Sequence, residues 1–153
     1  ARLRDRTFGR VRMSFITSAR VPERPVVTRN TATGTMRVST PEVTTFDLVE
    51  LPRRSGSLSN IATILSEMLG VQVLDSEQLA TVAATYPAAV IQRAGWLLEF
   101  VAQQVGAVIE LDALHSAAAR RATPTALASP GERKGPIDER WNVIVNTSVE
   151  PDL

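Results

Sequence analysis

The chain has 153 residues and a net charge of +1, with 44% hydrophobic residues, no cysteine and a single histidine, His115. A chain of this length can bury one core, and the lack of cysteine excludes disulfides, thiolate metal sites and cysteine nucleophiles. No apolar run approaches the roughly 18 to 20 residues of a membrane-spanning helix, and the arginine-rich start lacks the apolar segment of a secretion signal. We therefore expect a cytoplasmic protein that acts away from membranes.

Charge is distributed unevenly along the chain. The first 40 residues hold nine arginines and two acidic residues, a net charge of +7, whereas residues 41–153 carry a net charge of −6. A split of this kind is typical of a protein that presents one face to a polyanion or to an acidic partner. The N-terminal part is therefore the first place to look for a binding surface.

Residues 6–16, "RTFGRVRMSFI", alternate between apolar and polar side chains with a period of two, which predicts one half-buried strand. If the extended conformation continues toward the N-terminus, one side of it is lined by Arg2, Arg4, Arg6, Arg10 and Arg12. Guanidinium groups in such a row suit the phosphates of a nucleic-acid backbone. The alternative is an edge strand whose charges prevent pairing with other sheets, and both interpretations stay open.

Residues 26–39 predict a hairpin, with strands in "VVTR" and "TMRVS" joined by "NTATG". A helix then begins at "STPE". Thr40 can cap this helix with its hydroxyl, Pro41 needs no N–H donor in the first turn, and Glu42 lies where the helix dipole favours negative charge. The helix is expected to end near residue 51, where "LPRRSGS" forms a loop.

Hydrophobic spacing predicts three more helices. Residues 58–70 carry a core-facing stripe and end on Gly70 as the C-cap. The next helix follows Asp75 or Ser76 and stops at Tyr86, and the longest spans residues 88–105. Gly95 lies inside the longest helix, where glycine costs about 1 kcal/mol relative to alanine. We therefore expect another backbone to approach the helix closely at Gly95.

Two further elements complete the prediction. A short helix in "LDALHSAAARR" is capped by Asp112 and ends on Arg120 and Arg121, and a late strand is predicted in "RWNVIVN", residues 140–146. Early strands, a run of helices and a late strand predict an α+β fold. We expect one domain spanning residues 1–153, with a small mixed or antiparallel sheet packed against about five helices.

The carboxylates do not form an evident catalytic pair. Glu42 and Asp47 lie about 500° apart around a helix and do not converge on one atom, so we interpret Glu42 as helix capping and Asp47 as part of a solvated face. Glu110 and Asp112 have the E-x-D spacing of some metal-dependent phosphoryl-transfer sites, but Asp112 also suits an N-cap. With one histidine, no cysteine and no glycine-rich phosphate loop, we expect no catalytic residue, no metal site and no cofactor.

Three stretches together resemble the C-terminal domain of the AbiE-type abortive-infection antitoxins of type IV toxin–antitoxin systems. They are "MRVSTPEVTTFDLVELPRRSGSLSNIATILSEM", "YPAAVIQRAGWLLEFV" and "GPIDERWNVIVNTSVEPDL", and the resemblance covers most of residues 6–153. It implies that a winged helix-turn-helix domain precedes this region, binds inverted repeats in the promoter of its own operon and represses it. It also implies that the cognate toxin is a nucleotidyltransferase of the polymerase-β type, encoded beside the antitoxin, which acts on tRNA ends in studied relatives.

With this resemblance, the sequence predicts a non-enzymatic C-terminal antitoxin domain whose winged-helix domain is missing from this chain. The expected partners are the nucleotidyltransferase toxin and, through the full-length protein, promoter DNA, and a homodimer is a further option. The binding residues expected from charge are Arg4, Arg6, Arg10 and Arg12 first, and Arg53 and Arg54 second. Two alternatives stay open. One is a metal-dependent enzyme, either a nuclease or nucleotidyltransferase-like, that uses Glu110 and Asp112. The other is a structural dimerisation domain.

Overall fold

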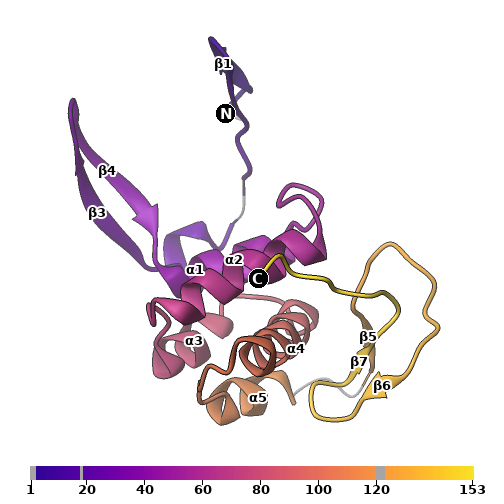
Figure 1. The fold of residues 1–153 in the computed structure, drawn as a ribbon. Coiled ribbons are helices and arrows are strands. Elements are labelled where there is room, and N and C mark those ends of the chain that lie inside the picture. The colour runs from indigo at the N-terminus through magenta and orange to yellow at the C-terminus, as the bar shows by residue number, and fades with distance from the viewer. Residues whose placement is uncertain (1–2, 18, 120–122) are drawn as a thin grey trace.

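The computed structural model describes residues 3–17, 19–119 and 123–153, and it confirms the α+β fold (Figure 1). Across these ranges, five helices form the body of the molecule, and the strands form three separate small sheets instead of the one sheet that the sequence predicts. Two of these sheets are hairpins that project from the helical body. The elements in chain order are β1 (Arg6–Phe8), β2 (Val11–Met13), the 3-10 helix η1 (Val21–Glu23), β3 (Val26–Thr31), β4 (Gly34–Ser39), α1 (Pro41–Glu50), α2 (Leu58–Gly70), α3 (Ser76–Ala83), α4 (Ala88–Val105), α5 (Asp112–Ala118), β5 (Thr125–Ala126), β6 (Ile137–Asp138) and β7 (Val143–Ile144).

The prediction of one half-buried N-terminal strand is wrong, because the segment turns back on itself. Gly9 takes φ +58°, a left-handed conformation that suits glycine, and the chain then pairs Arg6 with Met13 and Phe8 with Val11 in antiparallel β1 and β2. No side chain of either strand is buried, and Val11 is 64% exposed. The alternation therefore marks the two faces of a ribbon, and neither face is covered.

The second hairpin is confirmed, with a tighter turn than the sequence predicts. β3 and β4 pair antiparallel in continuous register from Val26 opposite Ser39 to Thr31 opposite Gly34, so only two residues are left for the turn. Most of their side chains are exposed. Figure 1 shows this ribbon extending away from the helices, so it adds little to the core.

Helix α1 begins as the sequence predicts. Oγ1 of Thr40 accepts a hydrogen bond from the N–H of Val43 at 3.4 Å, and Pro41 lies in the first turn. Glu42 is 5% exposed, and its Oε1 accepts a hydrogen bond from the backbone N–H of Asp75 at 3.1 Å. Glu42 lies in the first turn of α1 as predicted, but its hydrogen bond goes to the N-cap of α3, so it connects the starts of two helices.

Helices α2 and α3 follow the predicted hydrophobic spacing, and most of the apolar stripe of α2 is buried. Ser57 is the N-cap of α2. The predicted C-cap of α2 is wrong. Gly70 is the last helical residue, and the left-handed conformation falls on Gln72 at φ +53°.

Helix α3 begins after Asp75, one of the two starts that the sequence allows, and the carboxylate of Asp75 accepts a hydrogen bond from the N–H of Gln78 at 2.8 Å. The helix ends at Ala83, earlier than the predicted end at Tyr86.

Helix α4 lies at the centre of the core, and its Leu97 and Leu98 are fully buried. Gly95 is explained by a ring and not by the predicted backbone, since a Cβ at this position would lie 2.1 Å from the ring of Trp141. Trp141 is 1% exposed and donates its Nε1–H to Glu99 at 2.7 Å. None of the helices in the described ranges is long and apolar enough to cross a membrane.

Helix α5 starts without the predicted cap. Leu111 occupies the N-cap position, and Asp112 is the first helical residue and makes no capping hydrogen bond. Asp112 instead forms an ion pair with Arg140 at 2.9 Å. The predicted end of this helix at Arg120 and Arg121 lies outside the described residues.

The late strand is shorter than predicted, because Asn142 takes φ +53° and interrupts the extended backbone. The remaining strand, β7, lies between β5, with which it pairs in parallel, and β6, with which it pairs antiparallel. Val143 of β7 is fully buried and belongs to the same core as the helices. The third sheet therefore fastens the C-terminal segment to the helical body.

Candidate nucleic-acid and partner-binding surfaces

The arginines of the N-terminal hairpin do not form the single row that the sequence predicts. Directly paired residues share one face of a ribbon, so Arg6 lies on the face of its partner Met13, and Arg12 lies on the opposite face. Arg10 lies in the turn between β1 and β2, and Arg4 precedes β1. All four arginines are exposed. The hairpin thus carries positive charge on both faces and at its turn, because the turn at Gly9 separates arginines that one continuous strand would align.

Asp5 organises the open end of this hairpin. Its carboxylate accepts hydrogen bonds from the hydroxyl of Ser14 at 2.9 Å, from the guanidinium of Arg12 at 3.2 Å and from the backbone N–H of Phe15 at 3.4 Å. The bond from Ser14, followed by that from Arg12, holds the pKa of Asp5 below its ordinary value of 3.8. One of the four candidate arginines is therefore partly neutralised by a neighbour.

The other three arginines of the hairpin keep their charges unpaired. Within the described ranges, Arg4, Arg6 and Arg10 form no ion pair with an acidic side chain. An unpaired guanidinium has its planar set of N–H donors available for phosphate or carboxylate oxygens. Arg2, the remaining member of the predicted row, lies outside the described residues.

A further arginine, Arg24, anchors the segment between the two hairpins to the helical body. Its side chain is 8% exposed and donates to Asp47 at 2.8 Å and to Glu50 at 3.2 Å, both on α1. Its guanidinium carbon lies 3.8 Å from the centroid of the Tyr86 ring, and the hydroxyl of Tyr86 donates to Asp47 at 2.7 Å. The side chain of Asp47 is 40% exposed, in keeping with a solvated face, but it also binds Arg24 and Tyr86, which its place in the sequence does not predict.

The contacts of Tyr86 with Arg24 and Asp47 change its acidity. Burial, followed by the hydrogen bond to Asp47, raises the pKa of Tyr86 above its ordinary value of 10.0. The only signal of this cluster in the sequence was an arginine enclosed between two prolines in "PERP". The carboxylate partners of Arg24, Asp47 and Glu50, lie 23 and 26 residues further along the chain, and local sequence patterns do not extend so far.

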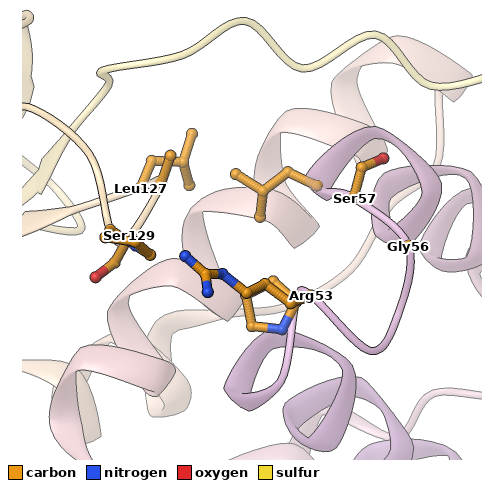
Figure 2. Close-up of a pocket in the computed structure, with 9 residues that line it drawn as sticks. Arg53, Gly56, Ser57, Leu127 and Ser129 are labelled. Atoms are coloured by element: carbon orange, nitrogen blue, oxygen red, sulfur yellow. The ribbon is translucent and has the colours of Figure 1, made fainter.

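Arg53 and Arg54 lie in the loop between α1 and α2, beside a groove (Figure 2). One wall is this loop with the start of α2, and the other is the segment of residues 127–130 after β5. Two pockets of about 210 Å³ and 380 Å³ adjoin here and share residues from both walls. Figure 2 shows the side chain of Arg53 reaching into the groove toward Ser129. Both arginines are exposed, and neither forms an ion pair with another described residue.

The residues considered for metal-dependent catalysis are placed differently. Asp112 is bound to Arg140, while Glu110 is exposed before the start of α5. Nε2 of His115 lies 2.7 Å from the carbonyl oxygen of Arg140. In the part of the chain that the structure describes, no group of three or more His, Asp and Glu side chains could hold a metal ion.

The structure thus combines a compact helical core with exposed arginines on a projecting hairpin and beside a groove, where their positive charge is accessible. The AbiEi antitoxin C-terminal domain model matches residues 2–100, and the chain belongs to this family. It is therefore an antitoxin domain of an abortive-infection toxin–antitoxin system, and a toxin partner is implied in general terms.

The family match ends earlier than the resemblance in the sequence suggests. It includes both hairpins, α1, α2, α3 and most of α4, whereas residues 101–153, with α5 and the third sheet, lie outside it. The last of the three stretches on which the resemblance rested is thus not part of the match. No curated protein and no solved structure gives a significant match to the chain.

Proposed function

We propose that this domain counteracts a nucleotidyltransferase toxin of a type IV abortive-infection system in the cytoplasm, without catalysing a reaction itself. In the full-length protein, a winged helix-turn-helix domain on the N-terminal side adds promoter binding and repression of the operon. The observation that carries this proposal is the family match over residues 2–100. The excess of positive charge in the first 40 residues supports it, because this charge lies next to the expected DNA-binding domain.

In this proposal the N-terminal hairpin contacts the DNA backbone beside the operator. A two-stranded ribbon fits the major groove of B-DNA, whose phosphates line both sides. Arg6 and Arg12 lie on opposite faces and Arg10 lies at the turn, an arrangement that suits contacts with both sides of a groove better than contacts with a flat surface. Arg4 extends the same charge toward the N-terminus, and Arg53 and Arg54 form the second electrostatic site.

Antitoxin activity is tested by growth rescue. The chain is expressed together with the nucleotidyltransferase encoded beside its gene, and we expect growth to recover relative to cells that carry the toxin alone. Rescue assigns antitoxin activity to these residues. A soluble, folded chain that fails to restore growth contradicts the proposal that this domain is sufficient to neutralise the toxin.

The contribution of the hairpin is tested in the full-length protein by the affinity for promoter DNA as a function of salt. The double substitution Arg6→Ala and Arg10→Ala is expected to weaken binding at low salt and to reduce the salt slope by about two, roughly one for each lost phosphate contact. The matched control, Arg29→Ala with Arg37→Ala, removes the same charge from the second hairpin. Unchanged affinity and salt slope in the Arg6→Ala, Arg10→Ala protein would contradict contact of the N-terminal hairpin with DNA.

A further inference from the structure

We propose that the groove between the α1–α2 loop and residues 127–130 docks an extended acidic segment of a protein partner, with its carboxylates held by Arg53 and Arg54. The occupant is a stretch in which one or two Asp or Glu residues are flanked by apolar residues. This inference rests on the proposed function in that it names an occupant for the second electrostatic site, which is formed by Arg53 and Arg54.

The wall formed by residues 127–130 is held in place before any ligand arrives. The backbone N–H of Leu127 donates to the carbonyl oxygen of Ile144 at 2.9 Å, which extends the third sheet by one bond. The side chain of Asn146 binds the backbone of the next residue in this wall. Its Oδ1 accepts from the N–H of Ala128 at 2.8 Å, and its Nδ2 donates to the carbonyl of Ala128 at 3.0 Å. A groove with one wall fixed in this way loses little conformational entropy on binding.

The opposite wall is fixed by the hydrogen bonds of Ser55. Its hydroxyl donates to the carbonyl oxygens of Leu48 and Leu51, both at 3.2 Å, and its own carbonyl accepts from Nδ2 of Asn60 at 2.6 Å. These bonds tie the loop to the end of α1 and to the first turn of α2. Both sides of the groove are therefore preformed, which is common for binding sites.

The lining of the groove combines apolar side chains with positive charge. Its apolar surface comes from Pro52, Leu58, Leu127 and Pro130. The guanidinium of Arg53 projects into this space (Figure 2). An occupant that satisfies both parts carries a negative group next to apolar side chains.

The positive charge of the groove is not neutralised within the domain. Glu50 also lines the groove, but its carboxylate is engaged by Arg24 at 3.2 Å, so Arg53 and Arg54 keep their positive charges for a ligand. Two guanidiniums match the oxygens of a carboxylate with charge-assisted hydrogen bonds. This charge complementarity identifies the occupant as acidic.

A peptide fits the groove better than a nucleic acid does. None of the residues that line the two pockets is aromatic, so the groove offers no ring on which a base could stack. The pocket volumes of about 210 Å³ and 380 Å³ lie below and near the lower limit of about 300 Å³ for ligand sites, which favours a short stretch of extended chain.

The test uses the whole chain, labelled with nitrogen-15, and two synthetic peptides. The acidic probe is Gly-Leu-Asp-Glu-Leu-Gly, and its uncharged counterpart is Gly-Leu-Asn-Gln-Leu-Gly. We expect the acidic peptide to shift the backbone amide signals of residues 53–58 and 127–129, and we expect the uncharged peptide to bind about tenfold more weakly. Equal binding of the two peptides, or no shift in these residues at millimolar acidic peptide, overturns the proposal.

Two variants locate the binding. Arg53→Ala combined with Arg54→Ala is expected to weaken binding of the acidic peptide about tenfold or more, whereas Arg29→Ala combined with Arg37→Ala removes the same charge elsewhere and leaves it unchanged. Ser129→Glu places a carboxylate on the wall that Arg53 faces and is expected to block the peptide. The amide spectrum of each variant reports its fold directly, and unaltered binding in a folded Arg53→Ala, Arg54→Ala protein overturns the proposal.

The outcomes also separate this inference from the proposed function. If a single-stranded oligothymidylate shifts the groove signals at lower concentration than the acidic peptide does, the site prefers phosphate and the peptide proposal is overturned. Growth rescue without peptide binding overturns the proposal that the groove docks an acidic segment and leaves the antitoxin proposal intact. Peptide binding at the groove without growth rescue supports the groove and contradicts only the antitoxin proposal.

Discussion

The helical body and the N-terminal hairpins both show regular spacing of apolar residues, but these residues are buried in the body and exposed in the hairpins. In the body, apolar residues with helical spacing meet in one core that contains Leu97 and Trp141. In the hairpins, apolar residues alternate just as regularly, yet Phe8 is 58% exposed, Val11 64% and Met36 53%. A period identifies which side chains share a face, but it does not establish that anything covers that face.

The difference also separates what each region contributes. A two-stranded hairpin without further packing is marginally stable in water, whereas a core of fully buried side chains supplies most of the stability of a domain. The body should therefore determine the free energy of unfolding, and the hairpins should determine the distribution of charge. Substitutions in the body should therefore change the free energy of unfolding far more than substitutions in the hairpins.

Gly95→Ala in α4 should destabilise the protein most. The new Cβ would lie 2.1 Å from the ring of Trp141, and that ring is also held by its hydrogen bond to Glu99. We expect the free energy of unfolding to fall by about 3 kcal/mol, at the upper end of the usual cost of overpacking. Urea denaturation followed by circular dichroism measures this change.

Gly70→Ala provides the matched control. Gly70 is also helical, at the end of α2, but no atom outside its immediate surroundings lies within 4 Å of the added Cβ. This substitution should stabilise the protein by about 0.4 to 1 kcal/mol, because alanine restricts the unfolded chain. A Gly95→Ala protein that is as stable as Gly70→Ala contradicts the packing of the Trp141 ring on α4.

Arg24→Ala tests the point at which the two regions join. The substitution leaves the carboxylates of Asp47 and Glu50 without their shared cation. A fully buried pair loses about 3 to 5 kcal/mol when one partner is removed, but the side chains of Asp47 and Glu50 are 40% and 29% exposed, so we expect a smaller loss of about 2 kcal/mol. Urea denaturation should show this loss, with faster proteolysis between the hairpins.

The control for Arg24 is Arg29→Ala on β3. Arg29 is exposed and forms no ion pair with any residue in the described ranges, so its removal should change the free energy of unfolding by less than about 0.5 kcal/mol. Equal effects of the two substitutions would mean that Arg24 does not anchor the N-terminal segment and that the body is independent of it.

The parts of the fold that the sequence predicts correctly depend on neighbouring residues. Thr40 and Asp75 cap helices because their side chains reach N–H groups three residues away, and the ends of α4 follow from local spacing. The failures are long-range. Gly95 correctly signalled a close approach, but only the structure shows that the Trp141 ring makes it. Trp141 lies 46 residues after Gly95, and no local pattern predicts that these two residues meet.

The candidate sites divide in the same way. Charge and turn residues were enough to propose Arg53 as a cation in a loop, whereas its lack of an ion pair with another described residue is seen only in the structure. The groove beside it requires residues 127–130 to lie across from that loop, and this follows from the pairing of β5 with β7. On the hairpin, the turn at Gly9 decided the faces of Arg6 and Arg12, and one misread turn was enough to change the predicted surface.

Tyr86→Phe should have a smaller effect that depends on pH. At neutral pH we expect a loss of about 1 kcal/mol, because the hydroxyl donates to Asp47 at 2.7 Å. The pKa of Tyr86 is raised in the folded protein, so its contribution to stability is complete below the ordinary pKa of 10.0 and is lost as the pH rises above it. Above about pH 10 the stability of the wild-type protein should therefore fall more steeply than that of the variant.

The titration behind this prediction can be observed directly. Tyr86 is the single tyrosine of the chain, so the ultraviolet absorbance of tyrosinate reports this residue alone. In the folded protein the absorbance should rise only above the ordinary pKa, and in denaturant it should rise near pH 10.0. A normal titration in the folded state contradicts the burial of the hydroxyl against Asp47.

Asp5→Asn should leave the body unchanged and loosen only the N-terminal hairpin. The pKa of Asp5 is lowered by its hydrogen bonds from Ser14 and Arg12, so the stabilisation of the hairpin is present above the ordinary value of 3.8 and is lost as the pH falls through the lower value in the folded protein. The backbone amide of Phe15, which donates to this carboxylate, should shift with the same titration, and the shift should be absent from the variant. A change in the urea midpoint of Asp5→Asn would contradict the separation of hairpin from body, because it would couple an exposed carboxylate to the core. A titration of Phe15 at or above 3.8 would instead contradict the hydrogen bonds that lower the pKa of Asp5.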